Sequence, residues 1–216
     1  MIVGSILLAF AIDAAWDLRR EQALDDDALR ALIAEIEQNE DQLRRYISTG
    51  RGARRAQMEL INLVGPNPIP ISQDSLARLA RTSWGFAVAE IQSGALNAAM
   101  DRTTPTKGSR RELLRLMRAY RIQLDDHVED GQQWTELRAE FIRHIGTVAP
   151  AAFLWGGTAV HGPTDFPVPV RAILSDQRLE GVVSQLTVRA YQMIGTMEDI
   201  RAASDSVRIA AEEEIR

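Results

Sequence analysis

Apolar residues recur at alternating steps of three and four along three long stretches of the chain, which places them on one face of a helix. The first stretch forms a seam at Leu29, Leu32, Ile36, Asn39, Leu43 and Tyr46. The second runs through Leu113, Leu116, Met117, Tyr120, Leu124, Val128, Trp134, Phe141 and Ile145. The third runs through Leu179, Val182, Leu186, Ala190, Met193, Met197, Ile200, Ser204 and Val207. Without a convincing strand pattern, the sequence predicts an all-α bundle of long antiparallel helices.

Proline and glycine residues divide these helices. The segment 65–71 contains three prolines and ends the first helix, because proline removes a backbone donor and forces extended backbone. Ser72 or Asp74 then caps a helix whose inner face carries Leu76, Leu79 and Ala80. Residues 84–100 are apolar around Ser93 and Gly94, which fits either two short helical pieces or one close-packed helix.

Three weaker interruptions are also visible. The Ser-Thr-Gly-Arg-Gly sequence at 48–52 is a candidate helix break, and Gly131 is a candidate bend inside the second long helix. Residues 147–169 are rich in Ala, Gly and Pro and include Trp155 and Phe166. This composition predicts a long loop whose aromatic residues pack on the bundle or contact a partner or membrane surface.

Asn39 is the one polar residue in the first seam. A buried asparagine at such a position fixes helix register or partner choice at some cost in stability. We therefore interpret Asn39 as a structural residue with no catalytic role.

The N-terminal segment is uncharged from Ile2 to Ile12, and Ala14 to Trp16 prolong the apolar run beyond Asp13. Sixteen helical residues span about 24 Å, less than a hydrocarbon core of about 30 Å. A cleaved signal peptide and a buried core helix are alternatives, but the first lacks a basic leader and the second requires an apolar stripe. A membrane helix explains the segment best, either shortened by a misassigned start codon or accommodated by the bilayer.

This interpretation divides the chain into a membrane-anchor helix at residues 1–16 and a helical bundle domain at residues 17–216. Trp16 then lies at the membrane interface, and Arg19 and Arg20 mark the aqueous side. We expect a single-pass protein of the bacterial inner membrane that contacts lipid through residues 2–16. The acidic neighbours Asp17 and Glu21 leave the orientation open.

Composition limits the chemistry that the chain can perform. The absence of cysteine excludes disulfides, thiolate metal sites and cysteine nucleophiles, and there are only three histidines. Residues 51–121 carry twelve basic and five acidic residues within a chain of net charge −5. A nucleic-acid partner is disfavoured, because the chain is acidic overall and its aromatic residues are not interleaved with the arginines.

The best metal candidate is Glu136, Glu140 and His144, spaced four residues apart on one helix. Carboxylate-bridged bundles require Glu-x-x-His elements on two helices, and this motif is absent from the sequence. A second group of titratable residues is interpreted as a solvated helix surface; it comprises Asp125, Asp126, His127, Glu129 and Asp130. Thr158 or Thr164 with His161 is a speculative nucleophile–base pair. We therefore predict no catalytic residues, no metal, no cofactor and no enzymatic activity.

Four short elements follow one another in a recognisable order. They are the apolar stretch ending at Asp17, Glu35-x-x-x-Asn39, Ile91-x-Ser-Gly-x-Leu96 and Ile173-Leu-Ser-Asp176. This order resembles a family of uncharacterised bacterial proteins with one N-terminal membrane helix and a helical domain of unknown function. The resemblance implies a membrane-anchored helical architecture, a few further residues ahead of the apolar stretch, and no particular activity.

Two functions remain open at the level of sequence. The long seams favour an accessory or structural subunit of a membrane assembly, which uses them for contacts with other subunits or for self-association. The alternative is a ligand-sensing bundle that binds a small molecule near Trp84, Trp134 or Trp155.

Overall fold

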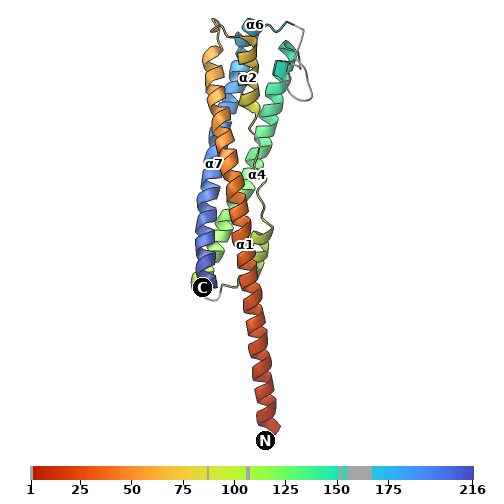
Figure 1. The fold of residues 1–216 in the computed structure, drawn as a ribbon, viewed down its shortest axis with the longest axis vertical. Coiled ribbons are helices and arrows are strands. Elements are labelled where there is room, and N and C mark those ends of the chain that lie inside the picture. The colour runs from red at the N-terminus through yellow and green to blue at the C-terminus, as the bar shows by residue number, and fades with distance from the viewer. Residues whose placement is uncertain (1, 87, 106–107, 151–152, 155–166) are drawn as a thin grey trace. The chain divides into compact units, whose positions relative to one another are not determined.

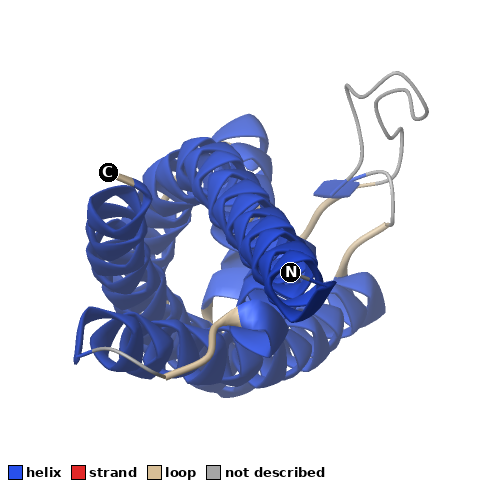
Figure 2. Ribbon diagram, turned by 90° about the horizontal axis from the view of Figure 1, so that it is seen from below, coloured by secondary structure: helices blue, strands red, loops and turns tan. Residues whose placement is uncertain are grey.

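The computed structural model contains six helices and no strand among the residues that it describes (Figures 1 and 2). The helices are α1 (Ile2–Leu63), α2 (Gln73–Trp84), α3 (Gly94–Arg102), α4 (Gly108–Val148), α6 (Val170–Leu174) and α7 (Gln177–Ile215). The described backbone comprises residues 2–86, 88–105, 108–150, 153–154 and 167–216, and side chains are described for Phe10 and from residue 12 onward within these ranges. The predicted all-α class is confirmed.

The helices pack into two compact units, and α1, α4 and α7 contribute to both. Unit 1 comprises Met1–Asp41, Ile91–Leu124 and Ile200–Arg216. Unit 2 comprises Gln42–Glu90 and Asp125–Asp199. Within each unit the buried side chains are mainly aliphatic and aromatic, so each has its own hydrophobic core.

Helix direction in unit 1 follows from its ion pairs. Arg110 in the first turn of α4 contacts Asp25 of α1 and Glu214 near the end of α7, at 2.8 Å each. Glu40, farther along α1, pairs instead with Arg201, which lies earlier in α7. Helix α7 is therefore antiparallel to α1, whereas α1 and α4 run in the same direction (Figure 1). The predicted antiparallel arrangement is wrong for this last pair, because α2, α3 and the segment between them return the chain from the end of α1 to the start of α4.

The three seams lie inside the units, with three exceptions: Tyr46 and Leu116 are half-buried, and Val128 is exposed. Every residue of the α7 seam is buried, and so are the α1 residues from Leu29 to Leu43, including Asn39. Tyr46 is half-buried, and Ile47 takes the inward position beside it. Val128 is 59% exposed, because its neighbour His127 is the residue of α4 that faces inward.

Two predicted interruptions are not helix ends. Helix α1 continues through residues 48–52, and α4 continues through Gly131. The predicted helix break at 48–52 is therefore wrong. Ser72 is confirmed as the N-cap of α2, where its hydroxyl accepts a hydrogen bond from the Ser75 N–H at 3.2 Å.

The segment 85–93 is neither of the two helical arrangements predicted for residues 84–100. Helix α2 ends at Trp84 and α3 begins at Gly94, and the described residues between them have no regular secondary structure. We call residues 85–93 the strap. Because such backbone lacks the internal hydrogen bonds of a helix, its buried polar groups need partners from elsewhere.

The N-terminal part of α1 has no buried side chain among its described residues. All residues from Ile12 to Leu24 are exposed, and so is Phe10. Within the described part of the chain, no helix combines the length and apolar character needed to cross a membrane. The predicted membrane-spanning helix is therefore not confirmed.

Most of the predicted loop at 147–169 falls outside the described residues, including Trp155, Thr158, His161, Thr164 and Phe166. Helix α4 itself extends to Val148. Phe153 and Leu154 are described and are buried.

Candidate functional site

Asn39 of α1 holds the end of the strap in unit 1. Its side-chain amide donates to the Gln92 carbonyl at 2.7 Å, and its oxygen accepts from the Gln92 N–H at 3.0 Å. Asn39 is 1% exposed, and these two bonds satisfy its buried amide. The predicted buried asparagine thus fixes the position of the strap relative to α1.

Glu35 lies one helical turn before Asn39 and caps α3. Its two carboxylate oxygens accept from the backbone N–H groups of Ala95 at 2.8 Å and Leu96 at 3.1 Å. Ser93, the N-cap residue of α3, makes no capping bond with its own side chain. The carboxylate therefore supplies the acceptors that the first turn of a helix requires, and its negative charge suits the positive end of the helix dipole.

Helix α4 contributes two further residues near Glu35 and Asn39, namely Tyr120 and Arg121. Tyr120 is fully buried, and burial raises the pKa of its hydroxyl to about 12. Arg121 donates to the Asn97 side chain of α3 at 2.6 Å and lies 3.5 Å from the Ser93 hydroxyl. We call Glu35, Asn39, Tyr120 and Arg121 the unit 1 bracket. It brings together two of the short elements noted in the sequence, Glu35-x-x-x-Asn39 and Ile91-x-Ser-Gly-x-Leu96.

A different set of side chains holds the chain in unit 2. Gln57 of α1 donates to the Ser83 carbonyl at 2.6 Å, and Trp134 of α4 donates to the Phe86 carbonyl at 2.9 Å. The ring of His127 lies with Nε2 3.2 Å from the Ala89 carbonyl, which can only accept. Gln57, His127 and Trp134 are each at most 2% exposed. We call these three residues the unit 2 bracket.

Two glycines make room for the strap in unit 2. A Cβ atom at Gly131 would lie 2.6 Å from a methyl group of Val88, and one at Gly50 would lie 2.8 Å from the Phe86 ring. Both distances are shorter than side chains normally tolerate. The predicted role of Gly131 as a bend is therefore replaced by a steric one, since the glycine lets the strap approach α4.

His127 is neutral in this setting. Burial lowers its pKa, and this effect exceeds the opposing effects of the Ala89 carbonyl and Asp130. The proton of the neutral ring is on Nε2, because that atom faces the carbonyl, whereas buried Nδ1 has no hydrogen-bond partner among the described residues. The prediction that residues 125–130 form a solvated cluster is thus wrong for His127.

Asp130 is also engaged, with Arg189 at 3.3 Å and the Thr196 hydroxyl at 3.2 Å. Asp126 and Glu129 are exposed, as predicted. The five residues 125, 126, 127, 129 and 130 therefore point in different directions around the helix and do not converge on one ligand.

The three residues of the metal candidate, Glu136, Glu140 and His144, do not share a ligand. His144 lies with Nε2 2.8 Å from Asp176 Oδ2, Glu140 pairs with Arg178 at 3.6 Å, and Glu136 is exposed. Asp176 also accepts from the Arg178 N–H at 2.8 Å at the start of α7. Although burial raises the pKa of Asp176, these bonds stabilise the anion and leave the pKa below the ordinary carboxyl value. Among the described residues, no three metal-binding side chains lie close enough to hold an ion.

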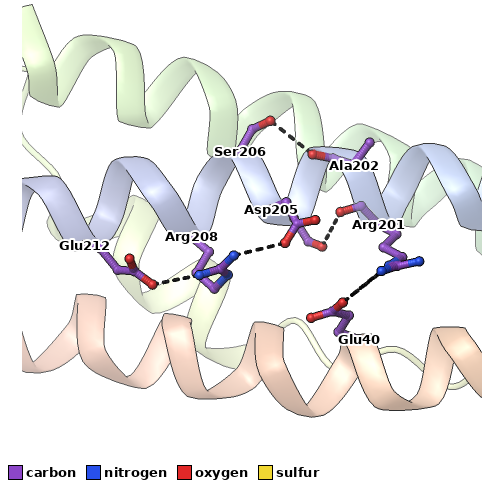
Figure 3. Close-up of polar contacts among 8 residues, drawn as sticks. Glu40, Arg201, Ala202, Asp205, Ser206, Arg208 and Glu212 are labelled. Atoms are coloured by element: carbon purple, nitrogen blue, oxygen red, sulfur yellow. Dashed lines mark hydrogen bonds and ion pairs between the residues drawn. The ribbon is translucent and has the colours of Figure 1, made fainter.

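Charged residues also connect α1 and α7 at the surface of unit 1 (Figure 3). Arg201 contacts Glu40 at 3.3 Å, and Arg208 contacts Asp205 at 3.3 Å and Glu212 at 2.9 Å. Because the Arg201 side chain is 44% exposed, solvent screens its pair. Only the Glu40–Arg201 pair joins the two helices, since Arg208, Asp205 and Glu212 all belong to α7, and these exposed pairs contribute little to stability.

No protein-family model matches the chain, and no curated protein and no solved structure matches it significantly. The resemblance to membrane-anchored bacterial proteins therefore rests on the four short sequence elements alone. The structure gives three of these elements a role inside the chain, since Asp176 of the last element caps α7.

Sequence reasoning placed Trp134 on a buried seam but missed its hydrogen bond and the other two residues of the unit 2 bracket. Gln57, His127 and Trp134 lie at positions where the helical period places buried residues, and the first two are polar. A polar residue at an apolar position of the period was the available signal, as it was for Asn39.

Proposed function

We propose that this chain is a membrane-anchored helical protein that makes contacts with other proteins, as an accessory or structural subunit of a membrane assembly. The observation that supports the anchor is the row of exposed apolar side chains on the first part of α1. Phe10 is 67% exposed, Ile12 51% and Trp16 71%, and Leu18 and Leu24 are exposed as well. Each large apolar side chain left in water forgoes about 1.5–3 kcal/mol of burial free energy.

The distribution of these side chains around the helix favours lipid over a groove. Phe10 and Ile12 are two residues apart and therefore point in directions separated by about 200°. A docking groove covers one face of a helix, whereas lipid chains surround it. Trp16, followed by Arg19 and Arg20, suits the boundary between lipid and water.

Protein contacts are proposed through apolar side chains that the two units leave exposed. Val188 and Tyr191 lie about one turn apart on α7 and are 59% and 63% exposed. The Arg54 guanidinium lies 5.0 Å from the centre of the Tyr191 ring. Aromatic residues and arginine are enriched in protein interfaces, so this surface of unit 2 suits a protein partner.

Alkaline carbonate extraction of bacterial membranes tests the anchor. We expect the full chain to remain in the membrane pellet and the double substitution Phe10→Asp and Ile12→Asp to move it to the supernatant. The matched control is Ile122→Asp with Val188→Asp, which places two carboxylates at positions that are equally exposed but lie outside the anchor. Extraction of the unsubstituted chain, or release of both double variants alike, contradicts the proposal.

The alternative function, a bundle that senses a ligand near its tryptophans, has less support at Trp84 and Trp134 than the proposed one. The Trp134 indole N–H is used by the Phe86 carbonyl, and its ring packs edge-to-face against the Phe86 ring at 5.2 Å. The Arg138 guanidinium lies 4.7 Å from the centre of the Trp84 ring. Both indoles are therefore occupied by groups of the chain itself.

A further inference from the structure

A cavity of about 420 Å³ lies in unit 2, away from both brackets and from the anchor. One wall is the proline-containing segment from Asn67 to Ile71, and the other is formed by Val170, Arg171 and Leu174 of α6. Its volume falls in the range of about 300–1,000 Å³ that is usual for small-molecule sites.

Proline residues, a backbone hydrogen bond and the packing of α6 fix the two walls of the cavity. Pro68 and Pro70 fix the backbone φ angle of the first wall. The Gly65 N–H donates to the Leu174 carbonyl at 2.9 Å and thereby joins this wall to α6. Ile173 and Leu174 are at most 1% exposed, so α6 is packed firmly into unit 2. A site formed in advance binds with a smaller entropic cost than one that must close around its ligand.

The chemistry of the lining selects one class of ligand. Six of the eight described lining residues are apolar, namely Pro68, Ile69, Pro70, Ile71, Val170 and Leu174. The other two are Arg171, which is the only charged side chain among these eight, and Asn67, which carries an amide. A guanidinium binds a carboxylate through two parallel hydrogen bonds, and the apolar walls exclude water from an aliphatic chain.

We propose that this cavity binds a small aliphatic carboxylate, with its anionic group on Arg171 and its alkyl chain against the isoleucines and Val170. The site is independent of the proposed anchor, because none of its lining residues belongs to α1. It adds a ligand-binding function to a protein whose buried polar side chains pair with groups of the chain itself.

Calorimetric titration with sodium hexanoate tests the proposal, using the full chain in phosphatidylcholine nanodiscs and empty nanodiscs as the blank. We expect saturable binding of hexanoate and at least about tenfold weaker binding of the uncharged hexanamide, since charge-assisted hydrogen bonds are lost. Arg171→Gln weakens hexanoate binding by about the same factor and leaves hexanamide unchanged. Arg143→Gln is the matched control, because Arg143 is an exposed arginine of α4 that does not line the cavity.

Three results overturn the proposal: no saturable binding of hexanoate, equal binding of hexanoate and hexanamide, or equal weakening by the two arginine substitutions. Ile69→Ser provides a second variant. Because Ile69 is 55% exposed, we expect this substitution to leave the fold intact. It must weaken the binding of both hexanoate and hexanamide. The Phe10→Asp and Ile12→Asp variant, titrated in buffer without nanodiscs, must bind hexanoate normally, so that failure of the anchor proposal and failure of this one remain distinguishable.

Discussion

The two units differ in the hydrogen-bonding groups that hold the strap and the helix ends beside it. In unit 1, Glu35 supplies only acceptors and Asn39 supplies both an acceptor and a donor. In unit 2, Gln57, His127 and Trp134 supply donors to three carbonyls of the chain between Ser83 and Ala89. The first bracket includes a carboxylate, whereas the second is uncharged, because burial keeps His127 neutral.

The difference reflects what the backbone leaves unpaired at each place. At the start of α3 the first N–H groups of a helix have no internal partner, so acceptors are needed there. At the end of α2 and in the part of the strap that belongs to unit 2, the groups that side chains pair are the carbonyls of Ser83, Phe86 and Ala89, so donors are needed there. Side chains of the long helices thus complete hydrogen bonding for a segment that forms no regular structure of its own.

The largest effect on the free energy of unfolding is expected at Trp134, whose substitutions test whether this residue of the unit 2 bracket also belongs to the hydrophobic core. Trp134→Ala removes a side chain that is 1% exposed together with its bond to Phe86, and we expect the free energy of unfolding to fall by about 3–5 kcal/mol. Trp134→Phe keeps most of the packing and loses only the donor, so a fall of about 1–2 kcal/mol is expected. Urea denaturation followed by far-UV circular dichroism measures both. Equal losses for the two variants contradict the role in the core, since both variants lack the indole N–H and only the packing differs between them.

The next effect compares one residue from each bracket. Asn39→Leu removes both hydrogen bonds to the backbone of Gln92, and we expect a loss of about 2 kcal/mol at roughly 1 kcal/mol for each bond. Gln57→Leu is the matched substitution in unit 2. It removes one bond to Ser83 and also an amide oxygen that has no partner among the described residues, so a loss of about 1 kcal/mol is expected. Urea denaturation measures both losses of unfolding free energy. A larger loss for Gln57→Leu than for Asn39→Leu contradicts the prediction.

The smallest effect is a pH dependence specific to unit 2. Because the pKa of His127 is lower in the folded protein, the unfolded chain binds the proton more readily, and the stability from neutral His127 is complete above about pH 6.5. It decreases as the pH falls below that value, by at most about 1.4 kcal/mol per pH unit. Unfolding free energies at pH 7.5 and 5.5 must therefore differ more for the native chain than for His127→Gln. An equal difference in the two proteins shows that His127 does not contribute, since the other titrating groups are common to both.

The sequence predicted the parts of this fold that depend on local periodicity. The α7 seam is buried at every predicted position, and the Ser72 cap follows from the residue type that starts helices. The break at 48–52 was predicted wrongly, because glycine there was taken as a local signal. Its role comes instead from a distant ring, that of Phe86. Of the two brackets, Asn39 was identified as buried and structural, but its partner lies 53 residues away in the chain.

By itself, then, the sequence determined that the chain is helical, which faces of its long helices are buried, and where proline ends the first of them. These properties depend on neighbours three or four residues apart. Only the tertiary structure decided that α1 and α4 run in the same direction and that the described residues between α2 and α3 form no regular secondary structure. The physical reason is that such an irregular segment becomes stable only when side chains from other helices pair its backbone groups. The positions of Gln57, His127 and Trp134 relative to those groups exist only once the helices have packed.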